Sequence, residues 1–325
     1  MRFFRLFLWP FTVGTAAVLV GVSVVQYSVA ASSPVRKAAT VPLALPVQTK
    51  VLVVAPHPDD EVLAAGDLIQ RTLSSGGRVR VVYLTNGDAY VTAARRTFDK
   101  LFLDPQDFRS LGLLRQREAL AALEVLGLSP GDAVFLGFPD KGLARIWLDH
   151  WNRPYLSLAT AASAVPYPGA LQPGVPYSGR EFVALIRQTL RDFQPDIIVI
   201  PGLMDLHPDH QAAAFFTRAA WSEERRTGAL AGSTLLEYVV HREAWHLEHG
   251  AGDLRLLTRD PEAISRRGYW LRLDPTPTER ARKRQAIRAY QSQVKVMPGF
   301  LYPFASRPEL FRLSGGRLGL RLRGA

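Results

Sequence analysis

The sequence predicts an α/β fold with a Rossmann-like, mostly parallel sheet, helices on both faces and an active site at the C-terminal ends of the strands. Short apolar runs alternate along the chain with longer segments whose apolar residues recur at helical spacing. Polar residues cluster directly after two of these runs. Strands that alternate with helices form parallel sheets through right-handed crossovers, and ligands bind where such strands end.

The apolar runs are short enough to be buried strands, and turn-forming residues separate them from the helical segments. The predicted strands are residues 51–55, 79–84, 133–136, 197–200 and 235–240. The predicted helices between them are residues 61–73, 113–126, 182–193 and 211–221. Gly127 follows the second of these helices, at the position where glycine ends many helices.

Composition limits the possible functions. The chain has 325 residues, 47% of them hydrophobic, and can bury a large core. Its formal net charge of +11 suits anionic partners, but no aromatic-interleaved basic patch or nucleic-acid motif is present, so no nucleic-acid partner is expected. The sequence contains no cysteine, which excludes disulfides and thiolate chemistry and leaves imidazole and carboxylate to bind any metal.

Residues 1–30 are expected to be a targeting segment, because Arg2 and Arg5 precede a long apolar run. The length of the run suits a membrane anchor, and the small residues at 28–30 also suit a cleavable signal. Either alternative predicts export. The catalytic domain is then extracytoplasmic and membrane-anchored, or secreted or periplasmic if the segment is cleaved.

The remaining chain is expected to comprise a linker at residues 31–49, an α/β domain at 50–300 and a basic flexible tail at 301–325. An insertion at 141–179 is rich in Trp, Tyr, Pro and Gly, and its aromatic rings either stack on sugars or pack the loop onto itself. Residues 278–296 predict a strongly basic helix that could face phospholipid.

Two His-Pro-Asp clusters carry the functional signal: 57–60 reads His-Pro-Asp-Asp, and 207–210 reads His-Pro-Asp-His. Both follow predicted strands, so they can meet at one edge of a parallel sheet. Imidazole and carboxylate suit Zn²⁺, which keeps three protein ligands and a water in catalytic sites. A spare carboxylate could take a proton from water and a spare imidazole could protonate a leaving amine, which predicts hydrolysis of an amide or similar acyl bond. The alternative is that these are turn residues, and the residue types alone do not say which carboxylate binds metal.

The first cluster, within Ala-Pro-His-Pro-Asp-Asp-Glu at 55–61, resembles the A-H-P-D-D-E signature of the PIG-L (LmbE-like) de-N-acetylase family, with Pro56 as one extra residue. The second matches that family's H-P-D-H motif, and a weaker echo lies at 289–293. The resemblance covers about residues 51–240. It implies a zinc hydrolase that removes acetyl from N-acetylglucosamine-type groups.

The resemblance also implies roles for individual residues. The implied ligands of one Zn²⁺ per chain, or of another divalent metal, are His57, Asp60 and His210. Asp59 would be the general base that activates the water. His207 would act as an acid and stabilise the oxyanion, and Asp209 would orient it.

Further residues are assigned by the same resemblance or by position. Arg115 would contact substrate hydroxyls or phosphate, and Asp140 would be an acidic substrate contact. Asn86 and Asp88 lie at the same rim without a defined role. Glu61 is interpreted as a first-turn acid of the following helix, where negative charge is favoured.

We therefore expect an exported zinc-dependent hydrolase that deacetylates an N-acetylglucosamine-type sugar in a glycan, glycolipid or secreted glycoside. One alternative is a metal-dependent hydrolase of another amide or ester, and another is a non-catalytic glycan-binding surface protein. No Gly-x-Ser-x-Gly elbow is present, and no Gly-x-Gly-x-x-Gly follows the first strand, so serine hydrolysis and dinucleotide binding are disfavoured. His241 follows the fifth predicted strand and could reach the rim, although a structural role is favoured.

Overall fold

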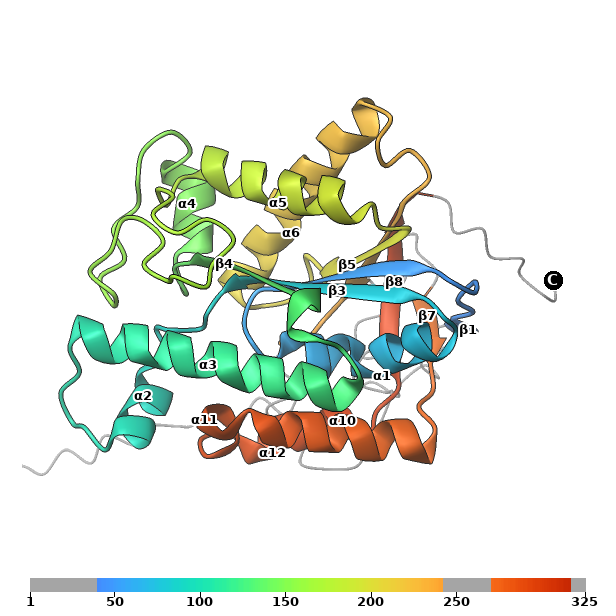
Figure 1. Cartoon of the computed structure of the whole chain (residues 1–325), viewed down its shortest axis with the longest axis horizontal. Coiled ribbons are helices and arrows are strands. Elements are labelled where there is room, and N and C mark those ends of the chain that lie inside the picture. Colours follow the sequence, from blue (N-terminus) through green and yellow to red (C-terminus); the bar gives the residue numbers. More distant parts are fainter. Residues whose placement is uncertain (1–39, 242–269, 317–325) are drawn as a thin grey trace, which may run out of the picture. The chain divides into compact units, whose positions relative to one another are not determined.

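The computed structural model describes residues 40–241 and 270–316, which form an eight-stranded sheet with helices on both faces (Figure 1). The strands lie in the order β1-β7-β8-β6-β5-β2-β3-β4. They are β1 Thr40–Pro42, β2 Lys50–Ala55, β3 Arg78–Thr85, β4 Ala133–Phe138, β5 Ile197–Pro201, β6 Thr234–Tyr238, β7 Trp270–Leu273 and β8 Glu309–Gly315. Neighbouring strands are parallel except β8, which is antiparallel to β6 and β7. The predicted, mostly parallel α/β fold is confirmed.

Both faces of the sheet are covered because its central strands are apolar on both sides, as parallel sheets require. Along β2, Val51 and Val53 belong to one buried cluster, and Leu52 and Val54 belong to the other. The first face carries helices α1 (Asp60–Ser74), α3 (Pro105–Leu126) and α10 (Pro277–Ala289) (Figure 1). The opposite face carries α4 (Leu143–Asp149), α5 (Gly179–Phe193) and α6 (Pro208–Arg226).

Local sequence sets the ends of the helices. The Asp104 side chain accepts hydrogen bonds from the backbone N–H groups of Gln106 and Asp107, and the Asp107 side chain accepts one from the N–H of Asp104. This capping box starts α3 at Pro105, earlier than the predicted 113, and Gly127 ends it in the left-handed conformation at φ 95°. Helix α2 (Val91–Phe98), between β3 and α3, was not predicted.

The prediction of a flexible tail from residue 301 is wrong for its described part. Residues 298–305 form α12 (Pro298–Leu301) and a short 3-10 helix (Tyr302–Ala305), and β8 then enters the sheet between β7 and β6. Phe311 of β8 is fully buried, so apolar contacts hold this strand in place. Residues 317–325 lie outside the described part.

Two other predicted boundaries are corrected, and the structure favours one of the two alternatives for the aromatic rings of the insertion. Part of the predicted linker, β1, pairs with β7, while residues 31–39 lie outside the described residues. The basic helix predicted at 278–296 ends at Ala289, and α11 (Gln291–Val294) follows it as a separate turn. In the insertion at 141–179, Tyr167 and Tyr177 are buried in the core, which supports packing rather than sugar stacking for these rings.

The prediction of export, with a membrane anchor or as a secreted or periplasmic protein, is corrected. Within residues 40–241 and 270–316, none of the helices is both long and apolar enough to cross a bilayer. The segment on which the prediction depended, residues 1–30, lies outside the described residues. The function of the site is therefore argued below without an anchor or a compartment.

Candidate active site

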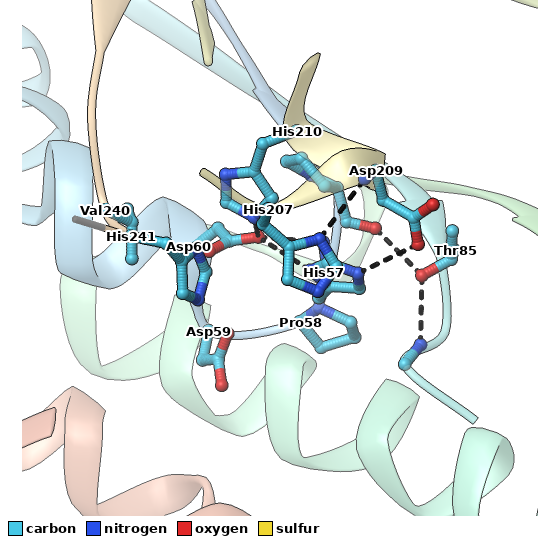
Figure 2. A network of polar contacts seen from close by, with 12 residues as sticks. His57, Pro58, Asp59, Asp60, Thr85, His207, Asp209, His210, Val240 and His241 are labelled. Carbon is cyan, nitrogen blue, oxygen red and sulfur yellow. Dashed lines mark hydrogen bonds and ion pairs between the residues drawn. The ribbon is translucent and has the colours of Figure 1, made fainter. Parts of the chain in front are cut away.

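The two predicted motifs meet at the carboxyl ends of the parallel strands. The loop after β2 carries His57, and the loop after β5 leads into α6 with His207 at its N-cap (Figure 2). They border a cavity of about 220 Å³. Its lining comprises His57, Asp59, Asp60, Leu63, Tyr90, Arg115, Asp140, Lys141, His207, His241, Gln293, Met297 and Phe300. The loops after β2, β4, β5 and β6 and the C-terminal segment at 293–300 thus build one site.

Two of the predicted metal ligands, His57 and His210, lie beside one carboxylate oxygen of the third, Asp60. Asp60 Oδ2 lies 3.2 Å from His57 Nδ1 and 3.1 Å from His210 Nε2, and it accepts the backbone N–H of His57 at 2.9 Å. All three side chains are buried. His210 Nε2 makes no hydrogen bond of good geometry, although a buried polar nitrogen normally has one. Two imidazoles and a carboxylate are suitable ligands for a divalent metal ion, and the nitrogen without a hydrogen bond is the one that faces this carboxylate.

The side chains around this point form three overlapping groups whose potential ligand atoms lie within 4.8 Å of one another. The groups are His57 with His207 and His210, Asp60 with His210 and His241, and His57 with Asp140 and Asp209. His241, which follows β6, reaches the cavity, and its ring centroid lies 4.6 Å from that of His210. The neighbouring imidazoles therefore offer more nitrogen ligand atoms than a metal ion with three protein ligands requires.

Asp205 is a buried organising residue that the sequence interpretation missed. Its Oδ2 lies 3.1 Å from His210 Nδ1 and accepts the N–H groups of Val240 at 2.8 Å and His241 at 3.0 Å. Its Oδ1 accepts the N–H of His207 at 3.0 Å. Burial acts to raise the pKa of Asp205, but the neighbouring imidazoles lower it below the ordinary range. The only sequence signal was a carboxylate two residues before the second motif.

The contact with Asp205 settles which nitrogen of His210 faces the cluster. Because the Asp205 carboxylate can only accept, Nδ1 of His210 donates to it, and the neutral form of this imidazole has its lone pair on Nε2, the atom beside Asp60. Burial acts to lower the pKa of His210, but the carboxylates of Asp60 and Asp205 raise it to about 9, so a bound metal ion would displace the Nε2 proton. A carboxylate behind a histidine in this way fixes the orientation and tautomer of metal-binding imidazoles. Asp205 also joins the loop after β5 to the end of β6, where Val240 and His241 lie.

Asp209 does not orient His207 with its carboxylate, which corrects that prediction. Asp209 Oδ2 accepts the N–H of Lys141 at 2.6 Å, and Oδ1 accepts the N–H of Leu143 at 3.1 Å. Oδ2 also lies 3.4 Å from His57 Nε2 (Figure 2). The role implied by the resemblance differs from the structure because this side chain, in the first turn of α6, points toward the loop after β4. Asp209 therefore positions His57 and that loop.

His207 is held by the backbone instead. Its Nδ1 accepts the N–H of Asp209 at 3.2 Å, as an N-cap side chain does. Burial and the surrounding imidazoles of His57 and His210 lower the pKa of His207 to about 3, so the ring is neutral at neutral pH. With Nδ1 as acceptor, the proton of the neutral ring is on Nε2.

Asp59 is the N-terminal flanking residue of α1 and has an unusual backbone conformation, with φ 122° and ψ −30°. Its carboxylate lines the cavity, and Oδ2 lies 3.3 Å from Arg115 Nη2. Burial raises the pKa of Asp59 to about 7, although the Arg115 guanidinium opposes this shift. The side chain predicted to be the base is thus buried and poised near neutral pH.

Arg115 lines the cavity, but much of its guanidinium is bonded to protein. Nη2 donates to the Pro58 carbonyl at 2.6 Å and Nη1 donates to the Gly87 carbonyl at 2.9 Å. Gly87 has φ 59°, and a Cβ there would overlap this guanidinium. Arg115 therefore fixes the loops after β2 and β3, and its contact with substrate stays a prediction.

Asp140, the predicted acidic substrate contact, faces both the cavity and the metal-ligand cluster. Its Oδ1 lies 3.3 Å from His57 Nε2, and its Oδ2 accepts the N–H of Ala89 at 2.9 Å. Asn86 and Asp88 are fully buried, and the Tyr167 hydroxyl donates to Asp88. Asp88 supports the rim, since its Oδ1 accepts the N–H of Asp140 at 3.4 Å.

The chain is similar in sequence to known proteins. A family sequence model described as PIG-L: GlcNAc-PI de-N-acetylase matches residues 52–221. The chain is similar to 1D-myo-inositol 2-acetamido-2-deoxy-alpha-D-glucopyranoside deacetylases. It is 30% identical to that of Tsukamurella paurometabola, over 53% of this chain and 54% of the relative. It is 32% identical to that of Mycobacterium leprae, over 53% and 49%. The chain spans about half the length of these relatives.

Solved structures share the fold. The A40926 pseudoaglycone deacetylase Dbv21 aligns with a TM-score of 0.53 at 20% identity, covering 82% of this chain and 97% of that one. A conserved protein from Thermus thermophilus, TT1542, aligns with a TM-score of 0.52 at 21% identity, covering 85% and 100%. N,N'-diacetylchitobiose deacetylase from Pyrococcus horikoshii aligns with a TM-score of 0.51 at 20% identity, covering 82% and 84%.

Proposed function

The chain belongs to the PIG-L family, and from this we propose that it is a metal-dependent hydrolase that removes acetyl from the nitrogen of an N-acetylglucosamine-type sugar. The observation that carries the proposal is the convergence of His57 and His210 on one oxygen of Asp60 beside the buried carboxylate of Asp59. The family description and the names of the similar deacetylases support the sugar substrate.

The metal we propose is one Zn²⁺, held by His57, Asp60 and His210. When bound, such an ion acidifies a water molecule and polarises the carbonyl of the acetamido group. The absence of cysteine and the mixed imidazole and carboxylate set are consistent with a catalytic rather than a structural zinc site.

The protein's own groups have the following roles in the proposed reaction. Asp59 accepts a proton from the attacking water and gives it to the amine nitrogen as the C–N bond breaks, and a pKa of about 7 suits a group that takes and returns a proton near neutral pH. His207 is neutral with its proton on Nε2, so it donates a hydrogen bond to the oxyanion that forms from the carbonyl. Asp140 and Lys141 at the cavity wall contact sugar hydroxyls.

The first prediction tests the function itself. The purified protein is expected to release acetate from glycosides of N-acetylglucosamine, to lose this activity with a chelator, and to regain it with about one equivalent of Zn²⁺. Acetate is measured with a coupled enzymatic assay on a panel that also contains other N-acyl amides and acetate esters. Turnover of only those other compounds would replace the sugar substrate with another amide or ester. Glycan binding without turnover of any compound would indicate a non-catalytic protein.

A second prediction concerns Asp205. Asp205→Asn keeps the shape of the side chain but removes the charge behind His210, and it is expected to weaken zinc affinity by about 10- to 100-fold. Competition with a chromophoric chelator measures this affinity without reference to activity. Asp149→Asn, an exposed aspartate paired with Arg145, is the control and is expected to leave affinity unchanged. Equal zinc affinity in Asp205→Asn and the parent would contradict a role in holding His210.

A further inference from the structure

The backbone at Asp59 is strained. Its φ of 122° lies in a region that residues with a Cβ rarely adopt. Such a conformation costs free energy and persists only when surrounding groups hold it. Its side chain makes no capping hydrogen bond to α1, so the cap itself does not account for the conformation.

The Glu61 side chain is bonded to this backbone. Its Oε2 accepts the N–H of Asp59 at 3.1 Å, and the side chain is completely buried. A location in the first turn of α1 explains why an acid is tolerated there, as the sequence interpretation had it. It does not explain why the Glu61 side chain is buried and accepts a hydrogen bond from the backbone of Asp59.

The other oxygen of Glu61 is held by Tyr290. The Tyr290 hydroxyl donates to Glu61 Oε1, and this ring is also buried, in the turn between α10 and α11. A buried carboxylate needs such partners because desolvation without hydrogen bonds is costly. The contact joins residues 229 positions apart, and it is the C-terminal segment that supplies the hydroxyl.

Arg115 completes the arrangement from the opposite side. Its Nη2 lies 3.3 Å from the Asp59 carboxylate and donates to the carbonyl of Pro58 at 2.6 Å. Both polar groups of the single peptide unit between Pro58 and Asp59, the carbonyl of Pro58 and the N–H of Asp59, are therefore bonded to buried side chains. Arg115 acts on the carboxylate, and Glu61 acts on the amide.

We propose that Glu61 and Tyr290 are positioning residues that hold Asp59 in its strained conformation, so that its carboxylate faces the cavity at the place where a water would be deprotonated. This inference rests on the proposed function of Asp59 as the base. Glu61 and Tyr290 do not touch the cavity, since neither belongs to its lining. Their effect on the reaction acts only through Asp59.

The test compares Tyr290→Phe and Glu61→Gln with the parent enzyme. Tyr290→Phe keeps the ring and removes the donor, and Glu61→Gln leaves one acceptor oxygen for two donors. Both are expected to lower kcat by about 10- to 100-fold, because small displacements of a catalytic group have effects of this size. KM and zinc affinity, measured by titration, are expected to change by less than about threefold, since the sugar and metal contacts stay intact.

Tyr177→Phe is the matched control. Tyr177 is equally buried and its hydroxyl also donates one hydrogen bond, to the Gly137 carbonyl at 3.2 Å, but it lies on the other face of the sheet. Tyr177→Phe is expected to lose about as much thermal stability as Tyr290→Phe but to keep the kcat of the parent enzyme. Rates are normalised to folded, metal-loaded protein, so that a purely structural loss does not register as a change in kcat.

The outcomes separate this inference from the proposed function. A parent enzyme with no deacetylase activity would overturn the function. An active parent with unchanged kcat in Tyr290→Phe, or with the same loss of kcat in Tyr177→Phe, would overturn the positioning role alone. If Glu61→Gln fails to fold, Tyr290→Phe decides the question, because it removes one oxygen atom and changes no packing volume of note.

Discussion

Asp59→Asn is expected to lower kcat by about 10²- to 10⁴-fold, the usual contribution of a general base. Asparagine has the size of aspartate and tolerates positive φ better than most residues, so the backbone at this position is disturbed little. The amide cannot accept the proton of the attacking water. Zinc affinity is expected to stay within a few-fold of the parent, because Asp59 is not among the three proposed ligands.

Asp99→Asn is the control for this substitution. Asp99 is also an aspartate at positive φ, 52°, but it is exposed at the C-terminal end of α2. Steady-state acetate release and metal content are measured for both variants. Near-parental kcat in Asp59→Asn would show that another group takes the proton, and joint loss of metal and activity would show that Asp59 binds the ion.

Lys283→Met is expected to destabilise the protein by about 3–5 kcal/mol, the usual effect of removing one partner of a buried ion pair. Lys283 Nζ lies 2.7 Å from Glu309 Oε1 and 3.4 Å from Asp67 Oδ2, and all three residues are buried. The substitution leaves two carboxylates without their cation. Glu309 also accepts the N–H groups of Asp67 and Leu68, just after α1 is interrupted at Ala65.

Urea unfolding of the metal-free protein measures this effect without a contribution from ligand binding. Arg145→Ala, which breaks an exposed pair with Asp149, is the control and is expected to change stability by less than about 1 kcal/mol. Adding Glu309→Gln to Lys283→Met is expected to restore part of the loss, because it removes one of the unpaired charges. Parental stability in Lys283→Met would show that the fold does not depend on the lysine to neutralise these carboxylates.

The sequence was sufficient for the parallel centre of the fold. Strands β2 to β6 are apolar runs with clear breaks, and their pattern comes from burial on both faces. Strands β1, β7 and β8 were missed. They are short or carry charged residues, for example Arg312, whose guanidinium pairs with Glu237 on β6. Such strands depend on partners that are distant in sequence, and local periodicity does not reveal them.

The site also contains residues with a local sequence signature and residues that depend on partners distant in sequence. His57, Asp60 and His210 were proposed as ligands because their two motifs resemble those of the family, whereas strand-end position alone predicted only that the two motifs meet. Asp205 and Tyr290 have no local signature, since their importance comes from which side chain they meet in the folded chain. The resemblance implied that Asp209 orients His207, whereas its carboxylate points to the loop after β4.

The position of β8 also affects how the chain can fold during synthesis. Residues 50–238 contain five neighbouring parallel strands, β6-β5-β2-β3-β4, and these can assemble as soon as they leave the ribosome. Until residues 309–315 emerge, the open edge of β6 has no partner within the described sheet. Strand β1 is synthesised first, but its partner β7 is synthesised after the five central strands. A nascent chain stalled before residue 309 would therefore carry an unprotected strand edge, the kind of surface that promotes aggregation.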